Sequence, residues 1–363
     1  MRVGILTMHH SYNYGAALQA FALSEAVTEM GNDVSLIDLR GTYNKMYADE
    51  STQLVMKRRP PSIANIHRSQ HRRKAELFNA FFDEYSSRSA PADPPANIDA
   101  IAEAFDTLIV GSDEVWTLKY GFNLNYFLSF GPENIGRISY AASFGRSTDV
   151  GDHSEEIKRA LEQFDAISVR DHNSQRIVRS ATGVMPPLVL DPVLLGKLGR
   201  ISAREQRTNT PPTVLIYEEQ QMSPSEVLAT RRVARELGAR IVAVGYPHWF
   251  ADENVIAAGP LEFIQLVQES TLVVSSLFHG VVFGLAFEKQ LLIMPAKKKR
   301  LKIESLLRQL GLTHLYGNLE WSRIEYDETR TRIEALRGVS LEFLETALRG
   351  IHERRVRESS LLG

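Results

Sequence analysis

The sequence predicts an α/β protein built from two Rossmann-like domains with mostly parallel sheets, and three observations lead to this fold class. The chain has 363 residues, enough for about two domains of ordinary size. Short apolar runs alternate with segments of helical periodicity, which is the pattern of a doubly wound parallel sheet. A polar stretch ending in Asn209-Thr210-Pro211-Pro212 separates two series of this kind. We therefore expect an N-terminal domain over residues 1–199, a linker over 200–212 and a C-terminal domain over 213–363.

The first forty residues have the pattern of one βαβ unit. Residues 3–8 form a continuous apolar run, typical of a strand covered on both faces. A polar loop leads into a helix over 16–30, and Gly31 follows where a left-handed cap is favoured. A second strand over 34–39 completes the unit. Further strands are predicted over 107–110, 138–142, 166–169 and 188–190, with a helix over 153–164.

The second half of the chain repeats this alternation. Strands are predicted over 214–217, 240–244, 272–274 and 291–294. Helices are predicted over 223–237, 261–269 and 278–288. In a pair of such domains, ligands bind beyond the carboxyl ends of the strands, so the functional site is expected in the cleft between the domains. We expect the last helix either to stay with the C-terminal domain or to pack back on the N-terminal one.

Composition excludes several classes of protein. Lys and Arg number 42 against 44 Asp and Glu, and the resulting net charge of −2 excludes a generally basic nucleic-acid binder. The chain has no cysteine, which excludes disulfides, thiolate metal sites and thiol nucleophiles. No tight group of metal-ligand residues appears, so no metal site is expected. Neither a signal peptide nor an apolar run of bilayer length is present, so we expect a cytoplasmic protein.

The loop after the first strand is poor in glycine. Gly15 is the only glycine between Met8 and Gly31, so the loop lacks the G-x-G-x-x-G motif of dinucleotide-binding proteins. A polar loop that feeds a helix N-terminus can bind an anion or a sugar through free backbone N–H groups. In the alternative interpretation, Asn13 only caps the helix. Both interpretations stay open from the sequence.

Several short motifs follow one another along the chain. The first is Ser11-Tyr12-Asn13-Tyr14-Gly15-Ala16-Ala17-Leu18-Gln19-Ala20. The others are Gly111-Ser112-Asp113-Glu114-Val115-Trp116, Ser139-Tyr140-Ala141-Ala142-Ser143-Phe144-Gly145, Ser168-Val169-Arg170-Asp171, Leu190-Asp191-Pro192 and Phe278-His279-Gly280. In sequence and in order, these motifs resemble those of the polysaccharide pyruvyl transferase family, and the resemblance extends over residues 3 to about 311.

The resemblance implies a fold and a reaction. The fold is the two-domain architecture of the GT-B glycosyltransferases, with the acceptor on the N-terminal side and the donor on the C-terminal side. The reaction is the transfer of pyruvate from phosphoenolpyruvate to a sugar as a ketal, in the biosynthesis of surface polysaccharides. Phosphoenolpyruvate is then a donor substrate, and no cofactor is expected. Such chemistry needs N–H or cationic donors for a small anion, and at least one general acid and one general base.

His279 is the first candidate for the catalytic acid. It follows an apolar strand and begins a helix, where the helix terminus favours phosphate. In the resemblance it is the family's histidine, implied to contact the donor. Many family members carry an arginine two residues earlier, and this chain has Leu277, which has no charge for an anion. Ser275 and Ser276, in the same turn, complete the substrate-binding residues expected there.

Other cations are candidates to replace the missing arginine. Arg170 ends a predicted buried strand at its carboxyl edge, and Arg146 is a weaker candidate of the same kind. The alternative for Arg170 is a salt bridge with a neighbour such as Asp171. The run Lys297-Lys298-Lys299-Arg300 follows the strand over 291–294, so Lys297 and Arg300 are included as substrate-binding candidates. Its alternative is a solvated loop and helix start.

Asp113 is the second catalytic candidate, because a carboxylate at the end of a strand can accept a proton from a sugar hydroxyl. Glu114 and Thr117 stand where the family usually has glutamine and asparagine, so different acceptor contacts are expected. Asn13, Tyr14 and Gly15 are expected to bind substrate. Asp191, which precedes a proline, is interpreted as mainly structural.

A basic segment over residues 57–74 contains no acidic residue. Such a segment can hold a protein near anionic lipid headgroups, at about 1 kcal/mol per basic side chain. This contact would suit a lipid-linked acceptor and a peripheral position at the inner face of the plasma membrane. The alternative is a solvated helix or insertion.

Two other functions remain open. The bilobed α/β pattern by itself also fits a glycosyltransferase that uses a nucleotide-sugar donor. The leucine at position 277 leaves room for a member of the family that binds a saccharide without catalysis. Thermal stabilisation by phosphoenolpyruvate, by UDP or GDP, or by a saccharide alone separates the three.

Overall fold

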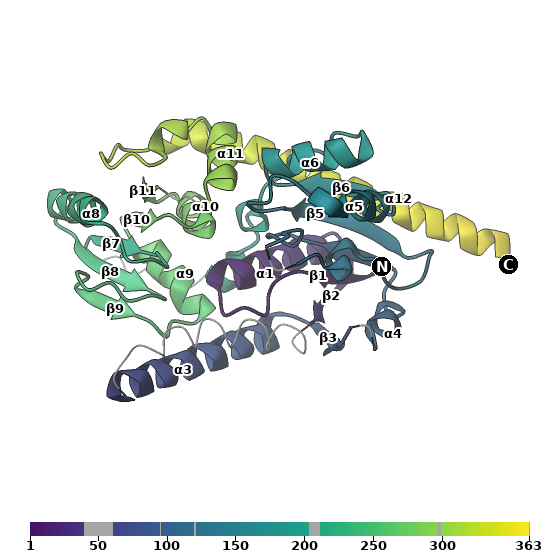
Figure 1. Ribbon diagram of the computed structural model, residues 1–363, viewed down its shortest axis with the longest axis horizontal. Helices are drawn as coiled ribbons and strands as arrows, with labels where there is room; N and C mark the ends of the chain where they lie inside the picture. The colour runs from purple at the N-terminus through teal and green to yellow at the C-terminus, as the bar shows by residue number, and fades with distance from the viewer. Residues whose placement is uncertain (40–60, 95, 120, 203–210, 296–298, 363) are drawn as a thin grey trace.

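A computed structural model describes residues 1–39, 61–94, 96–119, 121–202, 211–295 and 299–362, with the backbone alone for 61–68, 202 and 362. Each of the two domains is a parallel sheet covered by helices, and Figure 1 shows them side by side. The structure therefore confirms the predicted fold class. Within the described residues, no helix is long and apolar enough to cross a membrane.

The N-terminal sheet has six strands in the order β3-β2-β1-β4-β5-β6. Every pair of neighbouring strands is parallel. Strands β4 and β5 are buried along their whole length, as expected for a sheet with helices on both faces. The strands are β1 (Arg2–Leu6), β2 (Asp33–Asp38), β3 (Arg88–Pro91), β4 (Thr107–Val110), β5 (Gly136–Ala142) and β6 (Ala166–Val169).

The C-terminal sheet has five strands in the order β11-β10-β7-β8-β9, again all parallel. Strand β7 lies in the middle, between β10 and β8. The strands are β7 (Thr213–Ile216), β8 (Arg240–Val244), β9 (Glu253–Val255), β10 (Leu272–Ser275) and β11 (Gln290–Ile293).

Helices connect these strands as the sequence pattern predicts. Several end at glycines with positive φ, such as Gly183 at +78° and Gly311 at +73°, where other residues would be strained. The helices are α1 (Tyr14–Glu29), α3 (Pro61–Tyr85), α4 (Ile98–Ala102), α5 (Ser154–Leu161), α6 (His172–Thr182), α7 (Gly199–Ser202), α8 (Pro224–Glu236), α9 (Pro260–Glu269), α10 (Phe278–Ala286), α11 (Arg300–Leu310) and α12 (Tyr326–Leu362), with 3₁₀ turns at Leu124–Phe127, Gly151–His153, Pro192–Leu195 and Thr313–Leu315.

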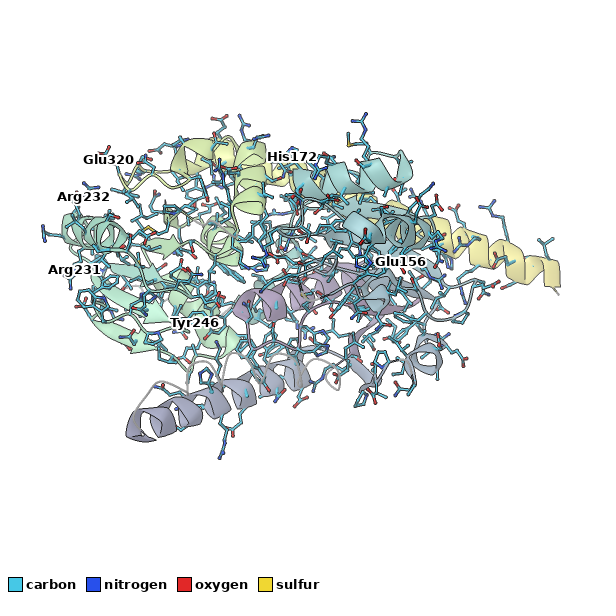
Figure 2. The ribbon with its side chains drawn as sticks, viewed as in Figure 1. Glu156, His172, Arg231, Arg232, Tyr246 and Glu320 are labelled. Carbon is cyan, nitrogen blue, oxygen red and sulfur yellow. The ribbon has the colours of Figure 1, made fainter. Side chains whose placement is uncertain are left out.

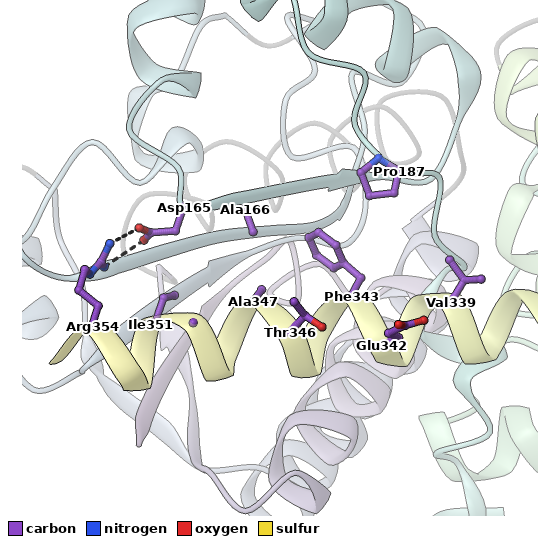
Figure 3. Close-up of a pocket in the computed structure, with 11 residues that line it drawn as sticks. Asp165, Ala166, Pro187, Val339, Glu342, Phe343, Thr346, Ala347, Ile351 and Arg354 are labelled. Atoms are coloured by element: carbon purple, nitrogen blue, oxygen red, sulfur yellow. Dashed lines mark hydrogen bonds and ion pairs between the residues drawn. The ribbon is translucent and has the colours of Figure 1, made fainter. Parts of the chain in front are cut away.

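The last helix, α12, contacts both domains. Near its start, Arg330 pairs with Glu288 of the C-terminal domain at 2.7 Å. Near its end, Arg354 pairs with Asp165, which directly precedes β6. Figure 3 shows this second half of α12 lying along the N-terminal sheet, with the Phe343 ring and the Ile351 side chain turned toward it. The helix therefore links the two domains a second time.

One predicted strand is wrong. Residues 188–190 form no strand and make a single bridge, between Val169 and Leu188. Proline residues at positions 186, 187 and 192 flank the segment, and they lack the N–H groups that a continuing ladder needs. Most of the predicted linker, 203–210, lies outside the described residues.

Candidate active site

The carboxyl ends of β4, β5 and β6 bring several polar side chains to the edge of the N-terminal sheet. After β4 the chain turns sharply, and Asp113 has a φ of +78°. Arg170 follows β6 and precedes Asp171, whose carboxylate caps α6 by accepting from the Ser174 N–H at 2.8 Å. The 3₁₀ turn that starts after Asp191 lies beside them. These turns aim one arginine and two carboxylates at a common point.

Arg170 is the centre of a buried ionic network. Its Nη1 donates to Oδ2 of Asp191 at 2.7 Å and to the Ser112 hydroxyl at 3.2 Å. Its Nη2 donates to Oδ1 of Asp113 at 2.9 Å. The guanidinium also lies over the Phe278 ring, 4.6 Å from the ring centroid. Since Phe278 belongs to α10, the network joins the two domains.

His279 enters this network from the other domain. Its Nε2 lies 3.4 Å from Oδ2 of Asp191, within ion-pair distance. This nitrogen is buried and has no hydrogen-bond partner among the described residues. His279 occupies the first turn of α10, whose N-terminus has no side-chain cap. An uncapped helix N-terminus leaves N–H groups for an anion next to the histidine.

Gly15 packs directly against the His279 ring. A Cβ atom at position 15 would lie 2.2 Å from both Cγ and Nδ1 of His279, closer than any real contact. Only glycine therefore allows the N-terminus of α1 to approach the imidazole. The contact places the first helix of one domain against the first turn of α10, next to the ionic network.

A second ionic group lies next to the first. Glu114 pairs with Lys302 of α11, and its Oε1 lies 3.7 Å from Nζ of Lys299. Nζ of Lys302 also lies 5.0 Å from the centroid of the Phe278 ring. The Phe278 ring therefore lies close to two cations, Arg170 of the N-terminal domain at 4.6 Å and Lys302 of the C-terminal domain at 5.0 Å.

The carboxylates of the site have low pKa values. Burial alone would raise them, but the neighbouring cations outweigh that effect. Arg170 and His279 hold the pKa of both Asp113 and Asp191 well below the ordinary range. Lys302 and Lys299 lower the pKa of Glu114 to about 2. All three groups are therefore ionised at neutral pH.

These low pKa values predict acid instability. A carboxyl group whose pKa is lower in the folded than in the unfolded chain stabilises the fold above the unfolded pKa of about 4, and loses this effect as the pH falls. Each such group adds a slope of about 1.4 kcal/mol per pH unit. We expect urea unfolding to show a free energy that falls steeply below pH 4, and a shallower fall for Glu114→Gln. If the unfolding free energy of the wild type and of Glu114→Gln fell equally steeply with pH, Glu114 would not have a lowered pKa in the folded protein.

Gly15→Ala is expected to displace the His279 ring and lower activity about 100-fold, since misplacement by about 1 Å has such an effect. Steady-state kinetics checks the activity, and a melting curve checks the fold. The matched control is Gly338→Ala in α12, where an added Cβ meets nothing within 4 Å. That variant is expected to keep its activity and to gain a little stability, because alanine favours the helix.

The structure places the other predicted residues as follows. Asn13 caps α1, its side chain accepting from the Ala16 N–H at 3.2 Å. Tyr14 is buried, and its hydroxyl donates to the Ala258 carbonyl of the C-terminal domain at 2.9 Å. The Ser275 hydroxyl holds the turn into α10, and the Ser276 N–H donates to Glu218 at 2.7 Å. Their roles in binding stay predictions.

The basic candidates fall in different places. Arg300 is exposed and pairs with Glu304 one turn along α11, at 2.8 Å. Lys297 lies outside the described residues, as do the side chains of residues 57–68 in the basic segment. Arg146 is exposed, next to Gly145, whose Cα faces the Glu114 side chain. Of the basic run 297–300, Lys299 is the residue that the structure places beside Glu114.

Sequence reasoning missed Lys302, Ser112 and the ionic role of Asp191. Lys302 lies in the first turn of α11, and its sequence neighbourhood gives no signal that its ammonium pairs with Glu114. Asp191 was interpreted as structural, and one of its oxygens does accept from the Val193 N–H at 3.2 Å. Its other oxygen meets Arg170 and His279. No group of three His, Asp or Glu residues suited to a metal occurs in the described part of the chain.

Comparison with solved structures shows the same architecture. The UDP-GlcNAc 2-epimerase of Methanocaldococcus jannaschii matches with a TM-score of 0.50 at 11% identity, over 92% of each chain. The epimerase of Rickettsia bellii matches at 0.48 and 12% identity, over 97% of each chain. The ADP-heptose heptosyltransferase II of E. coli matches at 0.38 and 9% identity, over 96% of this chain and 99% of that one. The first of these matches, together with the two parallel-sheet domains, shows that the fold is of the GT-B type.

Comparison of the sequence identifies the family. The search of curated proteins gave no match. The family model for polysaccharide pyruvyl transferases matches residues 13–295, which start at the N-cap of α1 and include the ionic network and the first turn of α10. The chain therefore belongs to the polysaccharide pyruvyl transferase family.

Proposed function

We propose that the protein transfers the pyruvyl group of phosphoenolpyruvate to two hydroxyls of a saccharide, which forms a ketal and releases phosphate. The observation that carries the proposal is the position of His279. The imidazole lies in the first turn of an uncapped helix N-terminus, with its Nε2 3.4 Å from Oδ2 of Asp191, and Asp191 also accepts from Arg170. An acid and an anion site are thereby adjacent.

The donor needs charge compensation without the family's arginine. Arg170 gives its charge to Asp113 and Asp191, so it serves mainly to position them. We propose that the N–H groups at the start of α10 bind the phosphate, together with Lys302 and Lys299. These two lysines share one carboxylate, that of Glu114, and so retain net positive charge.

The proton transfers can be assigned to the same residues. His279 donates a proton to the methylene carbon, which becomes the methyl group, and a saccharide hydroxyl attacks the adjacent carbon. The imidazole then accepts that hydroxyl's proton. Phosphate leaves, the second hydroxyl closes the ketal, and its proton ends on the phosphate. The low pKa of Asp113 makes it a weak base, so we assign it a hydrogen bond to the acceptor rather than proton removal.

We propose a surface polysaccharide precursor as the acceptor. Membership of the polysaccharide pyruvyl transferase family supports a saccharide as the acceptor. A lipid-linked precursor and a peripheral membrane contact through the basic segment 57–74, apart from the buried Lys74, form part of this proposal. Vesicles that contain anionic lipid test the contact, since binding should weaken with added salt.

The test is a screen for phosphate release from phosphoenolpyruvate with lipid-linked and nucleotide-linked sugars as acceptors. Phosphoenolpyruvate is also expected to raise the melting temperature, and His279→Ala is expected to abolish the shift. Stabilisation by UDP or GDP but not by phosphoenolpyruvate would favour a nucleotide-sugar glycosyltransferase. Binding of a saccharide with no phosphate release would identify a non-catalytic member of the family.

A further inference from the structure

A chain of buried hydrogen bonds leads from α1 to the ionic network. The Gln19 side chain donates from Nε2 to the Thr7 hydroxyl at 2.8 Å and to the Ala16 carbonyl at 3.0 Å. The Thr7 hydroxyl donates to the Ser112 carbonyl at 3.0 Å. Gln19, Thr7 and Ser112 are all 0% exposed. The chain therefore connects the second turn of α1, the residue after β1 and the turn after β4 in a region closed to solvent.

The direction of each bond in this chain is fixed. The Ser112 carbonyl can only accept, so the single hydroxyl proton of Thr7 points to it and the Thr7 oxygen is left to accept. The Gln19 side chain must therefore offer its nitrogen. The Ala16 carbonyl, which also can only accept, requires the same orientation. A rotated amide would place its oxygen against two acceptors, so the chemistry of the partners allows one orientation.

Ser112 is the point where this chain meets the ionic network. Its hydroxyl accepts from the Asp113 N–H at 2.6 Å and from Nη1 of Arg170 at 3.2 Å, and it donates to Oδ2 of Asp191 at 3.2 Å. A hydroxyl has one proton to donate and two lone pairs to accept with, so all three are in use. A shift of the Ser112 backbone would therefore disturb three contacts. One of them is with the carboxylate that lies beside His279.

Other members of the network have anchors of their own. Asp191 accepts from a backbone N–H of the 3₁₀ turn that follows it, at 3.2 Å. Arg170 lies two residues before His172, whose N–H donates to the Ser305 hydroxyl of α11 at 3.2 Å. Figure 2 shows His172 at the end of α6 that faces α11. For the turn after β4, a side-chain anchor is the Thr7 hydroxyl.

The amide of Gln19 carries a stability penalty. Its Oε1 is buried and has no hydrogen-bond partner among the described residues. A buried acceptor without a partner destabilises a folded protein, whereas an apolar side chain of similar size would carry no such penalty. The amide is therefore best explained by what its nitrogen holds, which is the Thr7 hydroxyl.

Helix α1 touches both sides of the candidate site. Gly15 packs against the His279 ring, and Gln19 reaches the turn after β4 through Thr7. Gly15 and Gln19 are four positions apart, so they lie on the same face of the helix. One turn of α1 therefore relates the position of the imidazole to that of the network that holds Asp191.

We propose that Gln19 and Thr7 are positioning residues, which set the Asp191 carboxylate relative to His279 for the transfer reaction. Gln19 acts on Thr7, Thr7 acts on the Ser112 carbonyl, and the Ser112 hydroxyl acts on Asp191. The inference rests on the proposed function for the reaction, but the positioning itself can be measured without turnover. Loss of either residue should lower kcat and leave KM for phosphoenolpyruvate nearly unchanged, since the groups proposed to bind the donor lie on the C-terminal domain.

The first test is the kinetics of phosphate release by Thr7→Val, which keeps the branched side chain and removes the hydroxyl. We expect kcat to fall by about 10- to 100-fold, the effect of a small misplacement, and Thr7→Ser to keep most of the wild-type rate. The matched control is Thr230→Val in α8. Thr230 is equally buried, and its hydroxyl donates to the Glu226 carbonyl of its own helix at 2.9 Å. A Thr7→Val kcat equal to that of Thr230→Val would overturn the proposal.

A double-mutant cycle tests the order of the chain. If Gln19 acts through Thr7, Gln19→Met should lower kcat in the wild type and have no further effect in Thr7→Val. Effects on kcat that multiply in the double variant would show that the chain from Gln19 to Thr7 is wrong.

NMR spectroscopy separates this inference from the proposed function. The Cε1–H signal of His279, assigned by its absence from His279→Gln, should shift in Thr7→Val and stay in place in Thr7→Ser and Thr230→Val. Gln19→Met should show the same shift and serves if Thr7→Val does not fold. An unchanged His279 signal would contradict the positioning role, even if the melting temperature fell. Failure of the proposed function would be seen separately, as absence of phosphate release by the wild type with every acceptor.

Discussion

Replacing His279 with glutamine is expected to lower the rate of phosphate release from phosphoenolpyruvate by about 100- to 10,000-fold, the usual contribution of a general acid–base residue. Glutamine is similar in size to histidine and keeps a polar group near Asp191. Its amide cannot donate or accept a proton as an acid or base at neutral pH. The loss should therefore appear in kcat, with KM for phosphoenolpyruvate changed far less. Steady-state kinetics at saturating acceptor measures both.

The matched control is His153→Gln. This histidine is half-buried just before α5, where its Nδ1 lies 3.0 Å from Oε2 of Glu156, and it lies outside the ionic network. His153→Gln should release phosphate from phosphoenolpyruvate at the wild-type rate. A His279→Gln protein that folds, binds phosphoenolpyruvate and retains more than about a tenth of the wild-type kcat would remove the histidine from the mechanism.

Arg170→Met is expected to destabilise the protein by about 3–5 kcal/mol, because it leaves two buried carboxylates without their cation. The Arg170 and Asp191 side chains are 1% and 0% exposed, so water cannot replace the lost pairing. Arg170→Lys keeps the charge but cannot bridge both carboxylates, so an intermediate loss is expected. Urea unfolding at pH 7 measures the difference.

A surface pair provides the comparison for this prediction. Arg240 and Glu253 are joined at 2.9 Å, and about half of each side chain is exposed. Arg240→Met should change the unfolding midpoint very little. If Arg170→Met changed it no more than Arg240→Met does, the buried network would not be the element that holds the strand ends together.

The sequence was sufficient to predict most of the fold. Apolar runs such as the one at residues 107–110 became buried central strands, because a parallel sheet covered on both faces needs continuous apolar sequence. Strand β9 was not predicted, and α3 was foreseen only as the solvated-helix alternative for residues 57–74. Lys74, Phe78 and Phe81 are buried at helical spacing, but most of the other residues of α3 are polar, so this spacing does not stand out in the sequence. Strand β9 has only three residues, Glu253–Val255, too few for an alternation to be visible.

The candidate site was predicted in part. His279, Asp113 and Arg170 could be found because strand ends and helix starts are visible as changes in the sequence pattern. Their mutual contacts could not, since they depend on how two sheets lie against each other. Lys302 illustrates the difference. Its pairing with Glu114 joins residues 188 positions apart, and nothing near either residue indicates the other.

Helix α12 has a consequence for how substrates reach the site. Its start is fastened to the C-terminal domain by Arg330 and its end to the N-terminal domain by Arg354. A continuous helix resists bending, so this side of the molecule acts as a fixed edge. Any separation of the two halves of the candidate site, with His279 on one and Asp191 on the other, is therefore expected to be a rotation about an axis near α12. In such a rotation, the opposite edge, where α3 meets α9, would move through the largest arc.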